Sequence, residues 1–563
     1  MNIQQPRCTI IADFTAEPLA NALLNDGLFP AIESVVAPLG PVQQSLMRLQ
    51  TEQTQPKPDL VIVWSRPEAT IPSFRALLRH ERVEPDQLLD EVDQFVDLLL
   101  DAAEQAEYLF IPTWTIPYYR RGGLLSMHPE VGCNIALMRM NLRVAERLQS
   151  SPNAFQLDAS RWLAAVGKNA SNPKLWLMGK IAFGSEVLGE ASADIKAGLC
   201  GLAGLSKKLV VLDLDDTLWG GIVGEVGWER LRLGGHDSIG EAHVELQEAL
   251  KALTRTGVVL GIVSKNDEAT ALAAIDRHPE MVLRRTDFAG WRINWNDKAA
   301  NLVDLADELN LGLDSVVFID DSPAERARVR EALPQVTVPD WPSDKLLYAS
   351  RLTEMRLFDR GMITAEDLDR TDMYVADRER IAAKRSFPSM DEWLASLAIV
   401  VRAARLDETN LARAAQLFNK TNQLTLTTRR RSERELLQWS RQPEHDVFVF
   451  RVCDRFGDYG LTGLAGLEMN DDRARITDFV MSCRVMGRGV EETILHTIVA
   501  RARDNGAGEV EAVYAPTDRN KPMLEFLENH SQLSPDGSGV RFTWDANQDY
   551  PSSPHVDLQI DCG

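Results

Sequence analysis

One stretch, residues 207–221 with the sequence KKLVVLDLDDTLWGG, constrains the fold of this chain more than any other. Its apolar run LVVL is typical of a strand that is buried on both faces of a parallel sheet. Asp213 and Asp215 follow directly, and Thr217 precedes a Trp-Gly-Gly turn. Because ligands of open parallel sheets bind beyond the carboxyl ends of the strands, the sequence predicts a site that contains this carboxylate pair.

The spacing of the two aspartates suits phosphoryl transfer. A carboxylate at a strand end can attack phosphorus and carry the phosphoryl group, so that one difficult displacement becomes two easier ones. The carboxylate two residues later points to the same side of an extended segment, where it can protonate the leaving group and then activate water. Two carboxylates beside a phosphoryl group need a cation, and we expect Mg²⁺. The alternative is a strand that ends in a solvated acidic turn.

Three further motifs follow in an order that fits the same chemistry. A second apolar strand ends in Ser264, whose hydroxyl can donate to a phosphoryl oxygen. Lys298 opens an amphipathic helix, and its ammonium can offset charge on the transferring group. A third apolar strand delivers Asp320 and Asp321. The predicted metal ligands are Asp213, Asp215, Asp320 and Asp321.

In this order the motifs resemble those of the haloacid dehalogenase (HAD) superfamily of phosphotransferases. The resemblance implies a HAD-like parallel sheet over residues 205–370, with Thr217 as a phosphate-binding residue. The gaps between the motifs are too short for a large cap domain, and residues 219–235 alternate β-prone pieces with glycines, which predicts a hairpin flap. An open site of this kind suits a substrate on a carrier protein, or a neighbouring domain that serves as the lid.

Length and composition describe a multidomain protein. A chain of 563 residues is too long for one core and predicts three or four domains. The net charge of -22 argues against a nucleic-acid partner. No apolar run reaches the length of a membrane span and no signal-peptide layout is present, so we expect a cytoplasmic protein without a membrane partner. The six scattered cysteines are expected to be reduced thiols.

Residues 1–195 are predicted to form an α/β domain in which apolar runs alternate with helical stretches. The expected strands cover residues 9–12, 60–64 and 108–111, and a long helix covers residues 85–106. This layout is similar to the SGNH-hydrolase fold, in which a nucleophilic serine follows the first strand. Here that segment reads Asp13-Phe14-Thr15, and Asp158 lacks the histidine of a late Asp-x-x-His. We therefore predict a non-catalytic domain for docking or scaffolding.

A third domain is predicted over residues 395–540, after a helical linker, and residues 541–563 are assigned to a C-terminal tail. Its expected elements are strands at 447–452, 461–467, 474–481 and 509–515 and helices at 490–505 and 521–529. Before the first of these helices, Arg484-x-x-Gly487-x-Gly489 resembles the glycine loop of GNAT acyltransferases. In that family, backbone amides at a helix N-terminus hold the pyrophosphate of CoA or the phosphate of phosphopantetheine. The resemblance implies that Arg484, Gly487 and Gly489 bind phosphate or pantetheine in a GNAT-like α+β domain.

Longer runs carry a more specific resemblance. They read LDLDDTLWGGIVGE, VSKNDE, RINWNDKA, FIDDSPAER, FNKTNQLTLTTRR, DRFGDYGL and MSCRVMGRGVE. Through them nearly the whole chain is similar to the FkbH-like family, the glyceryl transferases/phosphatases of polyketide-type pathways. The resemblance implies an α/β multidomain protein with a small phosphorylated three-carbon donor, 1,3-bisphosphoglycerate. Phosphate would be removed, and the glyceryl group would be loaded as a thioester onto a phosphopantetheine-bearing acyl carrier protein.

Cys483, beside the glycine loop, is the candidate acyl-carrying nucleophile. Arg484 and the helix N-terminus that follows would lower its pKa and raise the thiolate fraction. The alternative is a small buried hydrophobe, which most free cysteines are. Some family members carry a cysteine before the motif-two serine, but that position here is Val263. No base is evident, since His496 could simply face solvent.

Two other interpretations remain open at this stage. The protein could be a plain Mg²⁺-dependent phosphatase whose third domain only binds a partner, or a non-catalytic assembly factor, although the intact Asp213/Asp215 pair argues against the latter. The densest basic run, Arg429–Arg431 with Arg434, could attract an acidic carrier protein. It could equally be the solvated start of a helix.

Overall fold

The computed structural model describes residues 5–51, 57–235, 237–361, 363, 370–384, 387–421, 424–427, 429, 431, 433–470, 472–517, 520–537 and 540–561, without the side chains of residues 377, 379, 381, 382, 384, 420 and 483. The protein is a mixed α/β protein, as predicted, with three sheets. It divides into two compact units, Met1–Lys207 with Glu354–Met362 and Lys208–Thr353 with Ile363–Gly563. Within the described residues, no helix is both long and apolar enough to cross a membrane.

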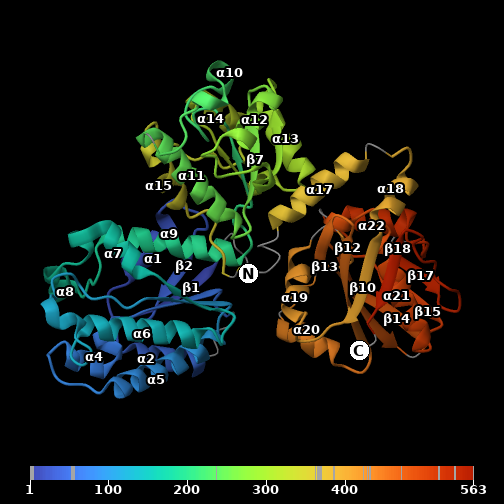
Figure 1. Cartoon of the computed structure of the whole chain (residues 1–563). Helices are drawn as coiled ribbons and strands as arrows, with labels where there is room; N and C mark the ends of the chain where they lie inside the picture. The colour runs from blue at the N-terminus through green and yellow to red at the C-terminus, as the bar shows by residue number, and fades with distance from the viewer. Residues whose placement is uncertain are drawn as a thin grey trace. The chain divides into compact units, whose positions relative to one another are not determined.

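The first unit contains a five-stranded parallel sheet with the strand order β2-β1-β3-β4-β5, of which Figure 1 labels β1 and β2. Its strands are β1 Arg7–Ala12, β2 Glu33–Val36, β3 Leu60–Trp64, β4 Tyr108–Pro112 and β5 Ala154–Leu157. Alternate residues of β3 enter different cores, because successive side chains of a strand point to opposite faces. One core includes α2 (Val42–Thr51), α4 (Pro72–Leu77), α5 (Pro85–Ala103) and α6 (Cys133–Leu148), and the other includes α1 (Glu17–Asn25), α7 (Ala159–Val166) and α9 (Ser185–Leu202).

The predicted boundary at residue 195 is wrong, because it falls inside α9. The apolar stripe of this helix continues through Ile195 to Leu199, and both side chains are buried in the core of the first unit. Residues 354–361, predicted to belong to the HAD-like domain, also pack with the first unit. Arg356 pairs there with Glu190 and Asp194 of α9.

The second unit begins with a four-stranded parallel sheet with the order β8-β7-β6-β9. Its strands are β6 Leu209–Leu212, β7 Val259–Ser264, β8 Phe288–Ile293 and β9 Val316–Ile319. The connecting helices are α11 Ser238–Thr254, α12 Glu268–Arg277, α13 Lys298–Glu308, α14 Pro323–Ala332 and α15 Tyr348–Thr353. All residues of β6, β7 and β9 are buried, which confirms the prediction of strands covered on both faces.

The predicted hairpin flap is a loop with helical turns. An antiparallel bridge joins Gly220 to Arg232, so the chain does reverse as expected. Between these residues lie α10 (Val223–Val226) and a 3₁₀ turn, Trp228–Arg230, instead of two strands. Gly221 and Gly227 have positive φ angles, which break an extended run at the positions where the hairpin was expected.

The third sheet has the order β16-β17-β15-β14-β13-β12-β10-β18, and β11 pairs with β14. Its strands are β10 Ile399–Arg405, β11 Leu424–Thr425, β12 His445–Asp454, β13 Gly457–Asn470, β14 Arg473–Met481, β15 Glu509–Val513, β16 Ser534–Pro535, β17 Arg541–Asp545 and β18 Val556–Ile560. The described helices nearby are α17 Arg370–Lys384, α18 Met390–Leu397, α19 Leu411–Lys420, α20 Glu433–Ser440, α21 Val490–Asp504 and α22 Lys521–Asn529. The strand–turn–helix order predicted around the glycine loop is confirmed.

The assignment of residues 541–563 to a tail is wrong, because two strands of the third sheet come from this segment. β17 pairs with β15, and β18 adds in parallel to β10. Phe542 and Tyr550 are buried in the core between the sheet and its helices. The short HVDLQI run, which alternates apolar and polar residues, was the signal for the last strand.

Candidate active site

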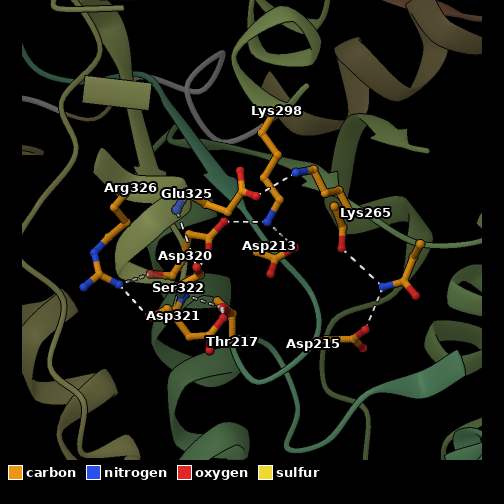
Figure 2. A network of polar contacts seen from close by, with 12 residues as sticks. Asp213, Asp215, Thr217, Lys265, Lys298, Asp320, Asp321, Ser322, Glu325 and Arg326 are labelled. Carbon is orange, nitrogen blue, oxygen red and sulfur yellow. Dashed lines mark hydrogen bonds and ion pairs between the residues drawn. The ribbon is translucent and has the colours of Figure 1, made fainter. Parts of the chain in front are cut away.

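Four polar side chains stand at the carboxyl edge of the second sheet, and Figure 2 labels three of them, Asp213, Asp320 and Lys298. Asp213 follows β6, Ser264 is the last residue of β7, Asp320 follows β9, and Lys298 is the first residue of α13. The strand order reverses at β6, since β7 and β8 extend to one side and β9 lies on the other. Open α/β sheets bind ligands at such a switch point.

Lys298 connects the ends of β6 and β9. Its Nζ lies 2.6 Å from Asp320 Oδ2 and 3.1 Å from Asp213 Oδ1, and the lysine is buried. The helix starts here because Asp297 caps it, accepting the backbone N–H groups of Ala299 and Ala300 at 2.8 and 3.2 Å. The cap therefore fixes the lysine at the floor of the site.

The carboxylates of the site are only partly compensated. Burial raises the pKa of Asp213 to about 6, against the effect of Lys298 and with a further increase from Asp320. Burial also raises the pKa of Asp320 and of Asp321. For Lys298, burial would lower the ammonium pKa, but Asp213 and Asp320 raise it above its ordinary value. One buried ammonium does not balance three carboxylates.

Asp213, Asp320 and Asp321 can hold a metal ion. Carboxylate oxygens of the three lie within 4.8 Å of one another. Asp213 Oδ1 is buried, and its charged neighbour is Lys298 Nζ at 3.1 Å. Several carboxylate oxygens at this spacing suit a hard divalent cation such as Mg²⁺, whose charge would also relieve their repulsion. The residues present therefore fit the expected metal.

Asp215, also predicted as a ligand, does not belong to this cluster. Its Oδ1 accepts from Trp219 Nε1 at 2.8 Å and from the Val223 N–H at 3.0 Å. Its Oδ2 accepts from Asn266 Nδ2 at 2.9 Å, and the same amide lies 3.3 Å from Ser264 Oγ. Three donors thus turn the Asp215 carboxylate toward the flap and the end of β7. The position suits a general acid and base more than a metal ligand.

Thr217 and Arg326 hold the Asp320–Asp321 turn. The Asp321 N–H donates to Thr217 Oγ1 at 3.0 Å, and this hydroxyl lies 3.5 Å from Asp321 Oδ1. Arg326 donates to the backbone carbonyls of Asp320 and Asp321 at 2.6 and 2.7 Å. Thr217, which was predicted to bind phosphate, contacts Asp321 in this structure. Sequence reasoning missed the roles of Arg326 and Asn266, although both stand inside quoted motifs, FIDDSPAER and VSKNDE.

The glycine loop of the third sheet is occupied by the protein's own groups. The Gly487 N–H donates to Glu491 Oε1 at 2.6 Å, and Ser553 packs so closely on Gly489 that a Cβ there would clash. The guanidinium of Arg484 lies 6.0 Å from the ring centre of Tyr374. The backbone of Cys483 begins the 3₁₀ turn after β14, but its side chain lies outside the described residues.

The space between β14 and β15 is also filled. The two strands pair in parallel only from Arg473 to Ile476 of β14. Beyond this point the segment that contains β11 lies between them, since the Leu426 N–H donates to the Phe479 carbonyl at 3.1 Å and the Leu426 carbonyl accepts from the Ala515 N–H at 2.9 Å. The chain therefore supplies its own strand at the place where β14 and β15 separate.

The basic run has both exposed and inward-facing side chains, and Arg429 is exposed. Arg431 is largely buried, lies 3.7 Å from Asp478 and stacks on Trp439 at 4.5 Å from the ring centre. Arg430 lies outside the described residues, and Arg434 is exposed on α20. An inward-facing Arg431 argues against the run acting as a whole on a partner.

In the first unit, the carboxyl edge of the sheet carries an ion pair. Asp13 follows β1 and accepts from the Arg66 backbone N–H and Nε, both at 2.8 Å, while Arg66 stacks on Trp176. Asp158 caps α7, accepting from the Ser160 N–H at 3.1 Å. Asp13 and Asp158 therefore both have hydrogen-bond partners within the protein.

Comparison with solved structures supports the phosphatase-like architecture. The chain is similar to the crystal structure of the N-terminal part of the protein BF1531 from Bacteroides fragilis, containing a phosphatase domain complexed with Mg. The identity is 28%, the match covers 64% of this chain and 95% of that one, and the TM-score is 0.58. No protein-family model and no curated protein sequence matches the chain.

Matches of about a quarter of the chain come from acetyltransferase structures. They include spermidine N-acetyltransferase SpeG from Vibrio cholerae, at 15% identity, with 26% of this chain and 94% of that chain covered and a TM-score of 0.21. Another is the ribosomal-protein-S18-alanine N-acetyltransferase from Escherichia coli, at 11% identity, with 27% and 97% covered and a TM-score of 0.20. Matches this distant do not bear on the activity of the third domain.

Proposed function

We propose that the second parallel sheet carries an Mg²⁺-dependent phosphatase or phosphotransferase site that works through Asp213. The observation that carries this proposal is the buried Asp213 carboxylate, which contacts Lys298 and shares a cluster with Asp320 and Asp321. The similarity to a phosphatase domain complexed with Mg supports the same chemistry.

The residues suit a two-step displacement. Asp213 attacks phosphorus, the bond from phosphorus to the leaving group breaks, and Asp215 gives the leaving oxygen a proton. Asp215 then takes a proton from water, which attacks phosphorus, frees Asp213 and releases inorganic phosphate. Lys298 offsets charge on the phosphoryl oxygens, and Ser264 can donate to one of them. Mg²⁺ held by Asp213, Asp320 and Asp321 would supply further positive charge there.

The finer proposal is that the substrate is 1,3-bisphosphoglycerate and that the glyceryl group is loaded onto an acyl carrier protein in the cytoplasm. The FkbH-like sequence runs support it. A thiolate attacks the acyl carbon, a thioester forms, and the bond to the C1 phosphate breaks with release of phosphate. Removal of the second phosphate at Asp213 would leave a glyceryl thioester. Cys483 is the proposed first acceptor, and exchange with the carrier's pantetheine thiol would regenerate it.

One observation favours a plain phosphatase as a second candidate. Residues around β11 fill the space between β14 and β15, and Glu491 accepts the hydrogen bond that the Gly487 N–H could donate to a ligand. A third domain closed in this way would bind a partner and would not accept an acyl thioester.

Mass spectrometry of a phosphopantetheine-bearing acyl carrier protein separates the two candidates. The carrier is incubated with the enzyme, Mg²⁺ and a system that generates 1,3-bisphosphoglycerate. A glyceryl adduct selects the transferase, and phosphate release without an adduct selects the phosphatase. If neither occurs, and Asp213→Asn behaves like the wild type, both candidates are wrong.

A second experiment locates the acyl group on the enzyme. With donor and no carrier, we expect an adduct that is labile to hydroxylamine on the peptide that contains MSCR. Cys483→Ser should lose this adduct, and the matched variant Cys453→Ser should keep it. An adduct on another cysteine, or full carrier loading by Cys483→Ser, would mean that the carrier thiol attacks the donor directly.

A further inference from the structure

An ion pair lies beside the candidate active site. Lys265 directly follows Ser264 at the end of β7, and Glu325 lies in the first turn of α14, just after the Asp320–Asp321 turn. Lys265 Nζ lies 2.7 Å from Glu325 Oε1, and Figure 2 draws this contact with the site residues. The pair therefore connects the strand end that would bind phosphate to the segment that would hold the metal.

Lys265 is more exposed than three other described cations near the site, Lys298, Arg326 and Lys345. Lys298 is held by Asp213 and Asp320, and Arg326 by the backbone of the Asp320–Asp321 turn. Lys345 pairs with Asp216, which also accepts the Gly221 N–H. The side chain of Lys265 is 41% exposed, against 4% for Lys298 and 25% for Lys345. Its flexible stem is thus the least constrained of the four.

Because the site is rich in carboxylates, Lys265 is suited to bind an anionic group of a substrate. The carboxylates of the site outnumber its buried ammonium, and a bound divalent cation would serve the transferring phosphoryl group. If a substrate carries a second anionic group close to Lys265, the Glu325 carboxylate would repel that group. Because exposed ion pairs contribute little stability, an incoming anion can displace Glu325 from Lys265 at small cost.

We propose that Lys265 binds a second anionic group, a carboxylate or phosphate, of a small phosphorylated substrate, with Glu325 as its partner in the free enzyme. This inference rests on the proposed phosphatase or phosphotransferase function. It makes Lys265 a substrate-binding residue that selects two-anion phosphates over single phosphates. A carboxylate or phosphate bound by an ammonium forms a charge-assisted hydrogen bond, which corresponds to about tenfold or more in affinity.

A matched pair of three-carbon phosphates tests this proposal. 3-Phosphoglycerate and glycerol 3-phosphate differ in whether the far carbon is a carboxylate or a hydroxymethyl group. Each is used as a competitor of acetyl phosphate hydrolysis by the full-length enzyme with Mg²⁺, and the ratio of the two inhibition constants is measured. A general change in phosphate binding cancels in this ratio.

For the wild type, we expect 3-phosphoglycerate to bind at least about tenfold more tightly than glycerol 3-phosphate. Lys265→Met should bring the ratio close to one, and Glu325→Gln should increase it by removing the competing carboxylate. The control is Lys251→Met, since Lys251 pairs with Asp287 at 3.1 Å in the same unit, with 35% of its side chain exposed. It should leave the ratio unchanged.

Three results would overturn the proposal: equal affinities in the wild type, an unchanged ratio in Lys265→Met, or a reduced ratio in Glu325→Gln. If acetyl phosphate is not hydrolysed at all, the proposed function fails on its own. In that case calorimetric titration of the same two compounds into the protein with Mg²⁺ still measures the ratio and decides the role of Lys265.

Discussion

The chain contains two parallel sheets with an aspartate at the same place, directly after a central strand, and the two aspartates differ in the groups that surround them. Asp13 in the first sheet accepts three contacts from Arg66, which also pairs with Glu68 at 3.3 Å. Asp213 in the second sheet shares one lysine with Asp320 and lies in a cluster of carboxylates. The comparison teaches that position at a sheet edge does not make a reactive site. Under the proposed function, the difference is the cluster of carboxylates, whose charge a metal and a phosphoryl group can use.

The largest effect is expected from the same change made in both sheets. Asp213→Asn should reduce phosphate release from acetyl phosphate at least about a thousandfold, because the amide cannot act as the nucleophile. Asp13→Asn should leave the rate within about twofold of the wild type, since this residue only pairs with Arg66. Circular dichroism checks that both variants are folded. A rate above a few per cent in Asp213→Asn would remove that residue from its role.

The second largest effect is expected from Mg²⁺, which should bind at the edge of the second sheet and not at the edge of the first. Chelation of Mg²⁺ should abolish phosphate release, and Asp321→Ala should shift the Mg²⁺ activation curve to about tenfold or more higher concentration, since one of three carboxylate ligands is lost. Mg²⁺ should also raise the melting temperature of the wild type by binding the native state, and less so in Asp321→Ala. An unchanged activation curve in this variant would point to Asp320 alone as the ligand from this turn.

Removing Arg66, the partner of Asp13, tests the ion pair in the first sheet. Arg66→Met should destabilise the protein by about 1–3 kcal/mol, because it leaves Asp13 buried and unpaired. This is less than a fully buried pair would lose, since Arg66 is partly open to solvent. Arg143→Met, which breaks a more exposed pair with Asp93, is the control and should lose about 1 kcal/mol or less. Denaturant unfolding measures both, and equal losses would contradict the distinction.

The smallest effect is expected from Glu491, a buried carboxylate of the third domain, and it concerns the pH dependence of stability. Burial raises the pKa of Glu491 to about 7, although the Gly487 N–H donates to it. Between its ordinary pKa and about 7 the native state binds more protons than the unfolded state, so the free energy of unfolding falls as pH rises through this window. Glu491→Gln should remove this fall and stabilise the protein by about 1–2 kcal/mol at pH 8, with no difference at pH 4.

The exposed Glu525→Gln on α22 is the control for the pH experiment and should change the unfolding free energy little at either pH. Identical pH profiles of the wild type and Glu491→Gln would show that the Gly487 amide compensates this carboxylate fully.

Sequence reasoning was most successful where an apolar run ends in a polar residue. The strands before Asp213 and Asp320, the strand that ends in Ser264, and the helix that Lys298 opens all lie where they were predicted. It failed where local signals were short or ambiguous. The strand β18, the helical turns of the flap and the extent of α9 depend on contacts with segments far away in the sequence.

By itself, the sequence determined which residues stand at the tips of the buried strands, because burial on both faces demands apolar runs and the polar residue after each run marks its end. Only the tertiary structure decided how the charges there are shared. Asp215 accepts a hydrogen bond from Asn266 and does not join the metal cluster. Lys265, after β7, pairs with Glu325 of α14. These pairings join different strand ends, so they depend on the order and register of the strands in the sheet. The spacing of the residues along the chain does not encode the order or the register of the strands.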